Sequence, residues 1–225
     1  MKYLFVSLFM SASLFAQSIN PVPIEKVFTP QGFDANDTSE VIISGYYPNL
    51  CYKNVFTKKE RIGNLIRINV YANVITDKAC AEAIVPFTKV VELGILAKGD
   101  YQVQVIAQNT IIKDTLTVQD RRSGDIDQFN YPLIEYIVTK PGSDRVILKA
   151  FKPSDCFIKG EVEYISDNKD TITVLPKLVR TSDFCPRKLT PIEYDITVPD
   201  NIPEKQYLLH VRSLSSSSVN KMLRK

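Results

Sequence analysis

The sequence predicts an all-β fold: two tandem immunoglobulin-like β-sandwich domains that arose by internal duplication, with one disulfide each. Three observations predict it. The four cysteines form two pairs with equal spacing, Cys51 with Cys80 and Cys156 with Cys185. The sequence around these pairs repeats in the two halves of the chain. Short runs rich in Val, Ile, Tyr, Phe and Thr alternate with turn residues, and no long segment has a helical period.

The amino terminus is typical of a secretory signal peptide. Residues 1–16 contain one basic residue, Lys2, then an apolar run, and end in the small residue Ala16 at the expected cleavage site. The run is shorter than the about 20 apolar residues that a spanning helix needs, and no other stretch is apolar and long enough. We therefore expect an exported, soluble protein, periplasmic or secreted, that does not span a membrane.

The repeat defines two domains, residues 17–120 and 132–225, joined by a linker at 121–131. The stretch VIISGYYPNLC before the first cysteine matches VILKAFKPSDC in the second half, and IEKVFT further upstream matches IEYIVT. A repeat of about a hundred residues indicates two related domains and not a solenoid, whose repeats are much shorter. After a Ser-rich turn, the last segment of the second domain is expected to pair as an edge strand, and its basic end is expected to fray.

Seven short strands are predicted in the first copy, and the second copy repeats the plan. Residues 101–105 alternate strictly between apolar and polar side chains, as a half-buried strand should. Seven strands in about a hundred residues are typical of an antiparallel β-sandwich; a small closed barrel is the alternative. A turn is expected at residues 58–64. The predicted strands are Glu25–Thr29, Glu40–Tyr46, Tyr52–Thr57, Leu65–Val74, Phe87–Leu93, Tyr101–Ala107 and Ile111–Val118.

The equal cysteine spacing predicts disulfides within each copy, Cys51–Cys80 and Cys156–Cys185. Bonds between the copies would discard the symmetry. Each bond closes a loop of about thirty residues, which restricts the unfolded chain by roughly 3–4 kcal/mol on the chain-entropy account. A zinc site is not expected, because zinc ligands come as closely spaced Cys and His pairs, and no cofactor is expected.

A longer pattern runs through the first copy: Pro-x-x-Cys, a second Cys, then Leu-x-x-Gly-x-Tyr-x-Val. Its residues are Pro48, Cys51, Cys80, Leu96, Gly99, Tyr101 and Val103. The pattern resembles small exported modules found in many uncharacterised bacterial proteins. The second copy departs from it with Lys205 at the Gly position. The resemblance implies an extracytoplasmic interaction domain and brings no catalytic residue with it.

The charge balance excludes nucleic acid as the expected partner. Without Lys2 of the signal, 27 basic residues stand against 25 acidic ones, and the clusters TKKER and KMLRK are short enough to be solvated turns or tails. The single histidine, His210, lies opposite Gln104 of the first copy, which predicts a wet strand face. No catalytic residue is expected, since Ser-His-Asp and Cys-His sites would all depend on that histidine.

The two copies differ most at PQGFDANDTSE, residues 30–40, which is longer in the first copy. We expect an exposed loop there. Its Asp and Asn residues are expected to make local turns, with a calcium site as the alternative for Asp34, Asn36 and Asp37. An aromatic surface of Phe33, Tyr47 and Tyr52 is a second hypothesis, against scattered surface aromatics. The candidate binding residues are Phe33, Asp34, Asn36, Asp37, Glu40 and Tyr47.

These observations predict an exported, non-catalytic binding or structural protein of the bacterial cell envelope. Its expected partner is an envelope or extracellular protein or a glycan. Two alternatives stay open. One is a periplasmic chaperone of the pilus-assembly kind, which binds through a strand edge. The other is an inhibitor of proteases or lysozyme, whose inserting loop would be residues 31–37 and would be removable without loss of folding.

Overall fold

The computed structural model describes residues 17–77, 79–121, 131–139, 142–182, 184–199 and 202–224. The expected signal peptide and most of the expected linker lie outside these residues. The described chain consists of β-strands and one short 3₁₀ turn, and it contains no α-helix. None of it therefore forms a helix long and apolar enough to cross a membrane.

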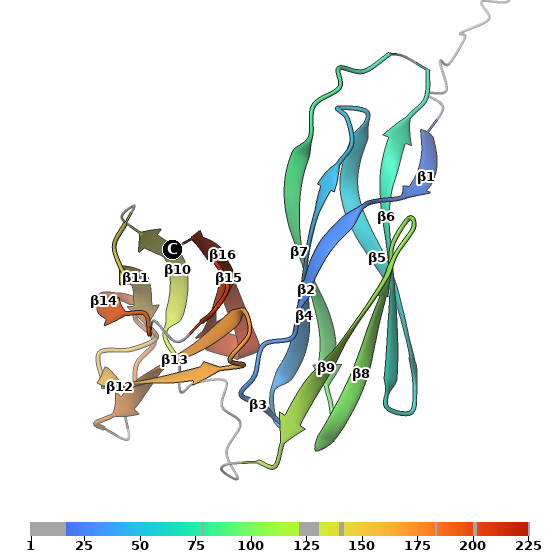
Figure 1. Ribbon diagram of the computed structural model, residues 1–225. Coiled ribbons are helices and arrows are strands. Elements are labelled where there is room, and N and C mark those ends of the chain that lie inside the picture. Colours follow the sequence, from blue (N-terminus) through green and yellow to red (C-terminus); the bar gives the residue numbers. More distant parts are fainter. Residues whose placement is uncertain are drawn as a thin grey trace, which may run out of the picture.

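The first half of the chain forms a β-sandwich of two sheets (Figure 1). One sheet has the order β2-β4-β7. In the other, β6 pairs with β5 along one edge and with β1 and β8 along the other, followed by β9 and β3. The strands are β1 (Gln17–Pro21), β2 (Ile24–Phe28), β3 (Phe33–Asp34), β4 (Thr38–Tyr47), β5 (Tyr52–Ile62), β6 (Leu65–Ile75), β7 (Val85–Ile95), β8 (Gly99–Ile106) and β9 (Ile111–Gln119).

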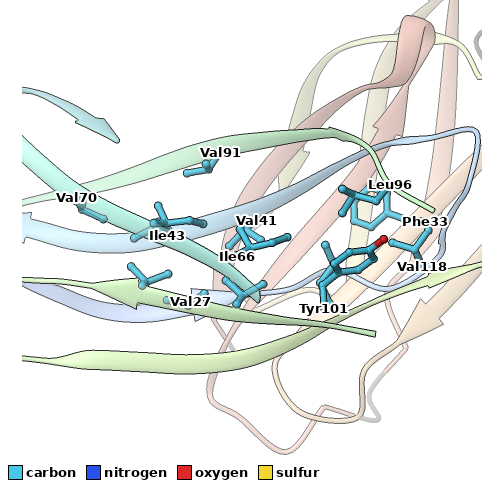
Figure 2. Close-up of a cluster of buried hydrophobic side chains, with 14 of the residues drawn as sticks. Val27, Phe33, Val41, Ile43, Ile66, Val70, Val91, Leu96, Tyr101 and Val118 are labelled. Carbon is cyan, nitrogen blue, oxygen red and sulfur yellow. The ribbon is translucent and has the colours of Figure 1, made fainter. Parts of the chain in front are cut away.

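Alternating side chains from both sheets build the core of this domain (Figure 2). Along β6 every second residue is buried, from Ile66 to Val74, because successive side chains of a strand point to opposite faces of the sheet. Val41 and Ile43 of β4 and Val91 of β7 face them from the other sheet. The period-2 pattern in the sequence is therefore the pattern of burial.

The second half repeats the sandwich with fewer strands. Its sheets have the orders β10-β11-β14 and β12-β13-β15-β16. They match β2-β4-β7 and β5-β6-β8-β9 of the first domain, and among the described residues only the first domain carries strands such as β1 and β3. The strands are β10 (Leu133–Thr139), β11 (Arg145–Lys152), β12 (Phe157–Ser166), β13 (Thr171–Arg180), β14 (Thr190–Thr197), β15 (Gln206–Ser213) and β16 (Ser217–Arg224).

The β-sandwich prediction is confirmed, but the sheets are not purely antiparallel. β6 runs parallel to β8, and β13 runs parallel to β15 at the same place in the second domain. The short strand β3 also pairs in parallel with β9. Because the same uncommon parallel pair occurs in both domains, the duplication inferred from sequence extends to the topology.

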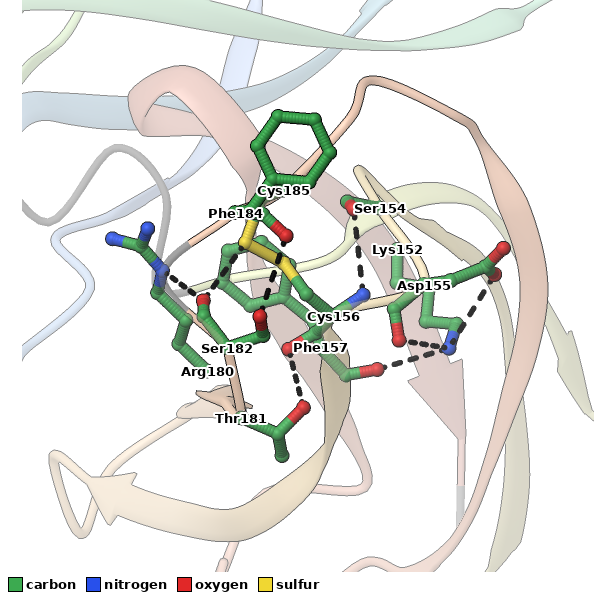
Figure 3. Close-up of a disulfide and its surroundings, with 10 residues drawn as sticks. All are labelled: Lys152, Ser154, Asp155, Cys156, Phe157, Arg180, Thr181, Ser182, Phe184 and Cys185. Atoms are coloured by element: carbon green, nitrogen blue, oxygen red, sulfur yellow. Dashed lines mark hydrogen bonds and ion pairs between the residues drawn. A yellow bond between two sulfur atoms is a disulfide. The ribbon is translucent and has the colours of Figure 1, made fainter.

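Both predicted disulfides are present. Cys51 bonds to Cys80 and Cys156 to Cys185, and in each pair the two Cα atoms are 5.5 Å apart. In the first domain the bond joins the turn after β4 to the connection between β6 and β7. In the second domain it joins the turn after β11 to the connection between β13 and β14. Around Cys156 the backbone is held further, since Thr181 donates to its carbonyl through N–H and hydroxyl, both at 2.8 Å (Figure 3).

Two local predictions are wrong. Residues 58–62, expected in a turn, extend β5, and only Gly63 and Asn64 turn before β6. Gly63 adopts φ 59° there, a conformation that glycine tolerates without steric cost. The tail pairs as the expected edge strand, since residues 217–224 form β16 beside β15, but its basic end does not fray in its described part.

Candidate functional site

The largest group of buried polar side chains in the described residues lies between the two domains. The outer face of β15 and β16 packs against β2, β4 and the segment from Thr29 to Glu40 of the first domain (Figure 1). Phe28, Ile42 and Leu208 are completely buried at the centre, with Met222 beside them. Full burial of one such side chain stabilises a fold by about 1.5–3 kcal/mol, so the two domains hold one another through an apolar contact.

A buried ion pair crosses this interface. Arg212 of β15 donates from Nη2 to Oδ1 of Asp37 at 2.5 Å, and the two side chains are only 2% and 4% exposed. The Arg212 guanidinium also lies over the ring of Phe33 at 5.0 Å and over that of Tyr131 at 5.7 Å. A guanidinium over an aromatic face is favourable when it is desolvated. The cation is thus held by one carboxylate and two rings.

A second buried polar group is centred on His210, two residues before Arg212 in β15. His210 has no exposed surface, and its Nδ1 is 2.9 Å from Oδ1 of Asn220 and 3.4 Å from Oε1 of Glu40. Because an amide oxygen only accepts, Nδ1 carries the proton. Asn220 donates in turn to Glu40 at 3.1 Å, and the Ser218 hydroxyl donates to the same carboxylate oxygen. A carboxylate of the first domain is therefore satisfied by β16 of the second.

Burial keeps His210 neutral. Desolvation lowers the pKa of its imidazole, the Glu40 carboxylate opposes this, and the Arg212 cation adds to it. The other ring nitrogen, Nε2, is buried without a hydrogen-bond partner. Protonation would place a second N–H there with no acceptor, which is costly in a dry environment. The histidine acts here as a buried neutral donor.

The backbone of the segment from Thr29 to Glu40 packs closely against the second domain and is held by local hydrogen bonds. Gly32 takes φ 92°, and a Cβ atom there would lie 2.6 Å from Cδ1 of Ile165 in the second domain. Glycine tolerates that φ without steric cost, whereas a larger residue would be strained there and would also have to displace the end of the Ile165 side chain. Asp37 accepts the N–H of Asp34 at 2.9 Å through Oδ2, and Asp34 accepts the N–H of Asn36 at 2.8 Å. These are the local Asp turns expected from the sequence.

Partly exposed contacts lie around the buried group. Lys26 of β2 forms an ion pair with Asp170 across the interface at 2.8 Å. Lys169 reaches Asp114 of the first domain at 3.3 Å, and the Thr29 hydroxyl donates to the same carboxylate. Burial raises the pKa of the Asp170 carboxyl, and Lys26 opposes that shift. These contacts fix the orientation of the domains around their apolar centre.

The predicted binding loop is therefore not exposed. Phe33, Asp34, Asp37 and Glu40 are each at most 4% exposed, and Asn36 is half-buried. The expectation of a free loop that can be removed without loss of folding is wrong, because the second domain covers it. The prediction that His210 lies on a wet face is also wrong, because the first domain covers this face of β15 with Phe33 and Glu40.

The calcium and aromatic hypotheses find no site in this geometry. The carboxylates of Asp34 and Asp37 accept hydrogen bonds from backbone N–H groups and from Arg212. No cluster of three or more metal-ligating side chains occurs in the described part of the chain. Tyr47 does not join Phe33: its ring lies 5.1 Å from that of Phe87, and its hydroxyl accepts the N–H of Val55.

Sequence reasoning missed the second domain's half of the interface, Arg212, Asn220 and Ser218. A signal was present. In the first copy YQVQV alternates, whereas YLLHV in the second copy is apolar at a position where its counterpart is Gln. A strand that is apolar on both faces is typical of burial on both faces. Leu208 is the residue that breaks the alternation, and it lies at the centre of the interface.

One comparison with known proteins found a match. Residues 41–118 match the family model of the ORF11 beta-sandwich domain. These residues lie in the first domain and run from β4 to β9, so the match supports a β-sandwich module there. Neither a curated protein nor a solved structure matched the chain.

Proposed function

We propose that this chain is an exported, non-catalytic binding protein of the bacterial cell envelope. Two disulfide-bonded domains are locked into one rigid unit that presents apolar surface to a protein partner. One observation carries the proposal: both copies expose an aliphatic residue four positions after their second cysteine. Ile84 is 73% exposed and Leu189 is 58% exposed.

This repeated exposure favours binding over folding as the role of these residues. In the second domain, Phe184 lies next to Cys185, in the same connection between strands as Leu189, and is 82% exposed (Figure 3). Single exposed apolar residues are common, but gathered ones mark interaction sites. A disulfide beneath such a surface limits the entropy lost on binding, because the loop is already ordered.

The state of the polar residues supports a non-catalytic role. His210 has no exposed surface, and Asp37, Glu40 and Arg212 are buried in the interface. All four cysteines are bonded in disulfides. Disulfides persist in oxidising compartments, which supports export. The inhibitor alternative loses its inserting loop, since residues 31–37 are packed against the second domain.

A site-specific cross-linking experiment tests the proposal. A photoreactive amino acid is placed at Ile84 or Leu189 of the full-length chain, in the bacterium that makes it, and at Ile111 as the control. Ile111 is 57% exposed and lies away from both disulfides, at the start of β9. We expect the chain in the envelope or medium fraction, with both disulfides formed and cross-linked from Ile84 or Leu189 only. A cytosolic chain with free thiols, or equal cross-linking from Ile111, would refute the proposal.

A further inference from the structure

The edge strand β7 has features that point to the partner's binding mode. β7 is eleven residues long, and β4 is its only sheet partner among the described residues. Ile84 precedes it, Val90 in its middle is 37% exposed, and Ile95 at its end is 67% exposed. A long apolar edge is a template for pairing with another strand.

The direction of the open backbone groups follows from one contact. Lys59 of β5 reaches across the sandwich and donates from Nζ to the carbonyl oxygen of Glu92. That carbonyl therefore points away from β4, toward the open edge. In an antiparallel strand the N–H and C=O of one residue point toward the same edge of the strand. The next residue points both groups to the opposite edge, so every second residue faces the same edge. The backbone groups of Val90 and Thr88 thus face the open edge, while Pro86 removes a donor at its start.

A groove runs beside this edge. It lies between β7 and β5, has a volume of about 240 Å³, and is apolar at its base through Ile66, Leu93 and Leu96. Lys59, Glu60 and Arg61 of β5 form its other side. This is the basic cluster TKKER, which belongs to a strand and not to a turn. An added strand on β7 would place alternate side chains over this groove.

The corresponding edge strand of the second domain, β14, carries charged side chains that disfavour the addition of another strand. This strand has eight residues. At the positions of Thr88 and Val90 it carries Glu193 and Asp195, which form ion pairs with Lys149 and Arg145. Charged side chains on an edge prevent the addition of another strand. The duplication therefore kept one edge open and closed the other.

Charge indicates the chemistry of the added strand. Lys58, Lys59 and Arg61 on β5 and Lys89 on β7 surround the edge. Of the two acids there, Glu60 is paired with Arg67 at 3.3 Å, and Glu92 is exposed on β7. The excess is positive, so acidic residues in the partner would be attracted. We propose that β7 binds an extended segment of a partner protein, alternating apolar and acidic side chains, as an additional strand of the β2-β4-β7 sheet. This inference rests on the proposed binding function and specifies its mode.

The test uses the mature chain and a defined probe. The probe is a labelled peptide of about ten residues, a usual strand length, that alternates Val and Glu; the control peptide has the same composition in two blocks. Binding is followed by fluorescence anisotropy, and the amides of Thr88 and Val90 by hydrogen exchange. The double variant Thr88→Glu/Val90→Asp transfers the closed edge of the second domain. Val179→Asp is the matched control, since Val179 is an exposed strand valine in the other domain.

We expect saturable binding of the alternating peptide, slower exchange at Thr88 and Val90, and binding weakened about tenfold or more, equivalent to 1.4 kcal/mol, in the double variant only. Thermal unfolding of the double variant should stay unchanged. Absence of binding, equal binding of the block peptide, an equal loss in Val179→Asp, or self-pairing of the chain through β7 would overturn the inference. If cross-linking from Leu189 persists in those cases, the proposed function survives without this binding mode.

Discussion

Removal of the Arg212 side chain tests the role of the interface most directly. In the variant Arg212→Met the carboxylate of Asp37 stays buried and loses its cation. Breaking a buried ion pair by removal of one partner costs about 3–5 kcal/mol, because an uncompensated charge stays in a dry environment. The side chains here are 2% and 4% exposed, so solvent does not relieve that charge. We expect a loss of stability in this range.

The chain contains its own control, an ion pair of the same residue types on the surface. Arg145 and Asp195 are 66% and 51% exposed, and exposed pairs contribute about 0–1 kcal/mol. Arg145→Met should therefore lower stability by no more than this. In the double variant Asp37→Asn/Arg212→Met the buried charge is gone, and the loss should be smaller than the sum of the single losses by about 0.5–3 kcal/mol.

Urea unfolding of the mature chain at neutral pH measures these differences. In the wild type the interface couples the two domains, so we expect one transition; in Arg212→Met the domains should unfold in separate steps, which departs from two-state behaviour. The denaturant slope reports this as well. If Arg212→Met costs no more than Arg145→Met and the transition stays single, the ion pair is not what holds the domains together.

Three further predictions follow from the same geometry. Burial lowers the pKa of His210 below its ordinary 6.5 in the folded chain. The unfolded chain therefore binds more protons, and the free energy of unfolding should fall as the pH drops below about 6.5. His210→Asn should remove this part of the pH dependence in thermal melts. Gly32→Ala should cost about 1–2 kcal/mol through the positive φ, with a further loss because the end of the Ile165 side chain must shift. Ile165→Val, which removes the contacting Cδ1, should restore that further loss, and no rescue would contradict the contact. Replacement of Cys156 and Cys185 by Ser should cost about 2–5 kcal/mol; an unchanged melting temperature would contradict a stabilising bond.

Much of the fold could be predicted from local patterns. The seven strands of the first copy, the two domains and the disulfide pairs follow from side-chain alternation, repetition and cysteine spacing, which depend on residues close in sequence or on symmetry. The parallel pairing of β6 with β8 could not be predicted in this way. Strand order depends on contacts between distant segments, and an alternating strand looks the same whether its neighbour runs parallel or antiparallel.

The sequence predicts less of the candidate site than of the fold. The sequence makes Asp34, Asp37 and Glu40 unusual, because acidic residues gather where the copies differ. Acidic loops are usually solvated, so the sequence predicts exposed carboxylates here, whereas the structure buries them. Nothing within residues 30–40 shows that Arg212 and Asn220, some 180 positions further on, satisfy these carboxylates.

The sequence by itself determined the local conformation, the duplication and the disulfide framework, since each depends on short-range chemistry that is visible in the order of residues. Only the tertiary structure decided which surfaces stay exposed. One face of the second domain covers the acidic segment of the first, and one of two duplicated edges stays open. Both are properties of packing between distant surfaces, which residue order specifies only through the folded whole.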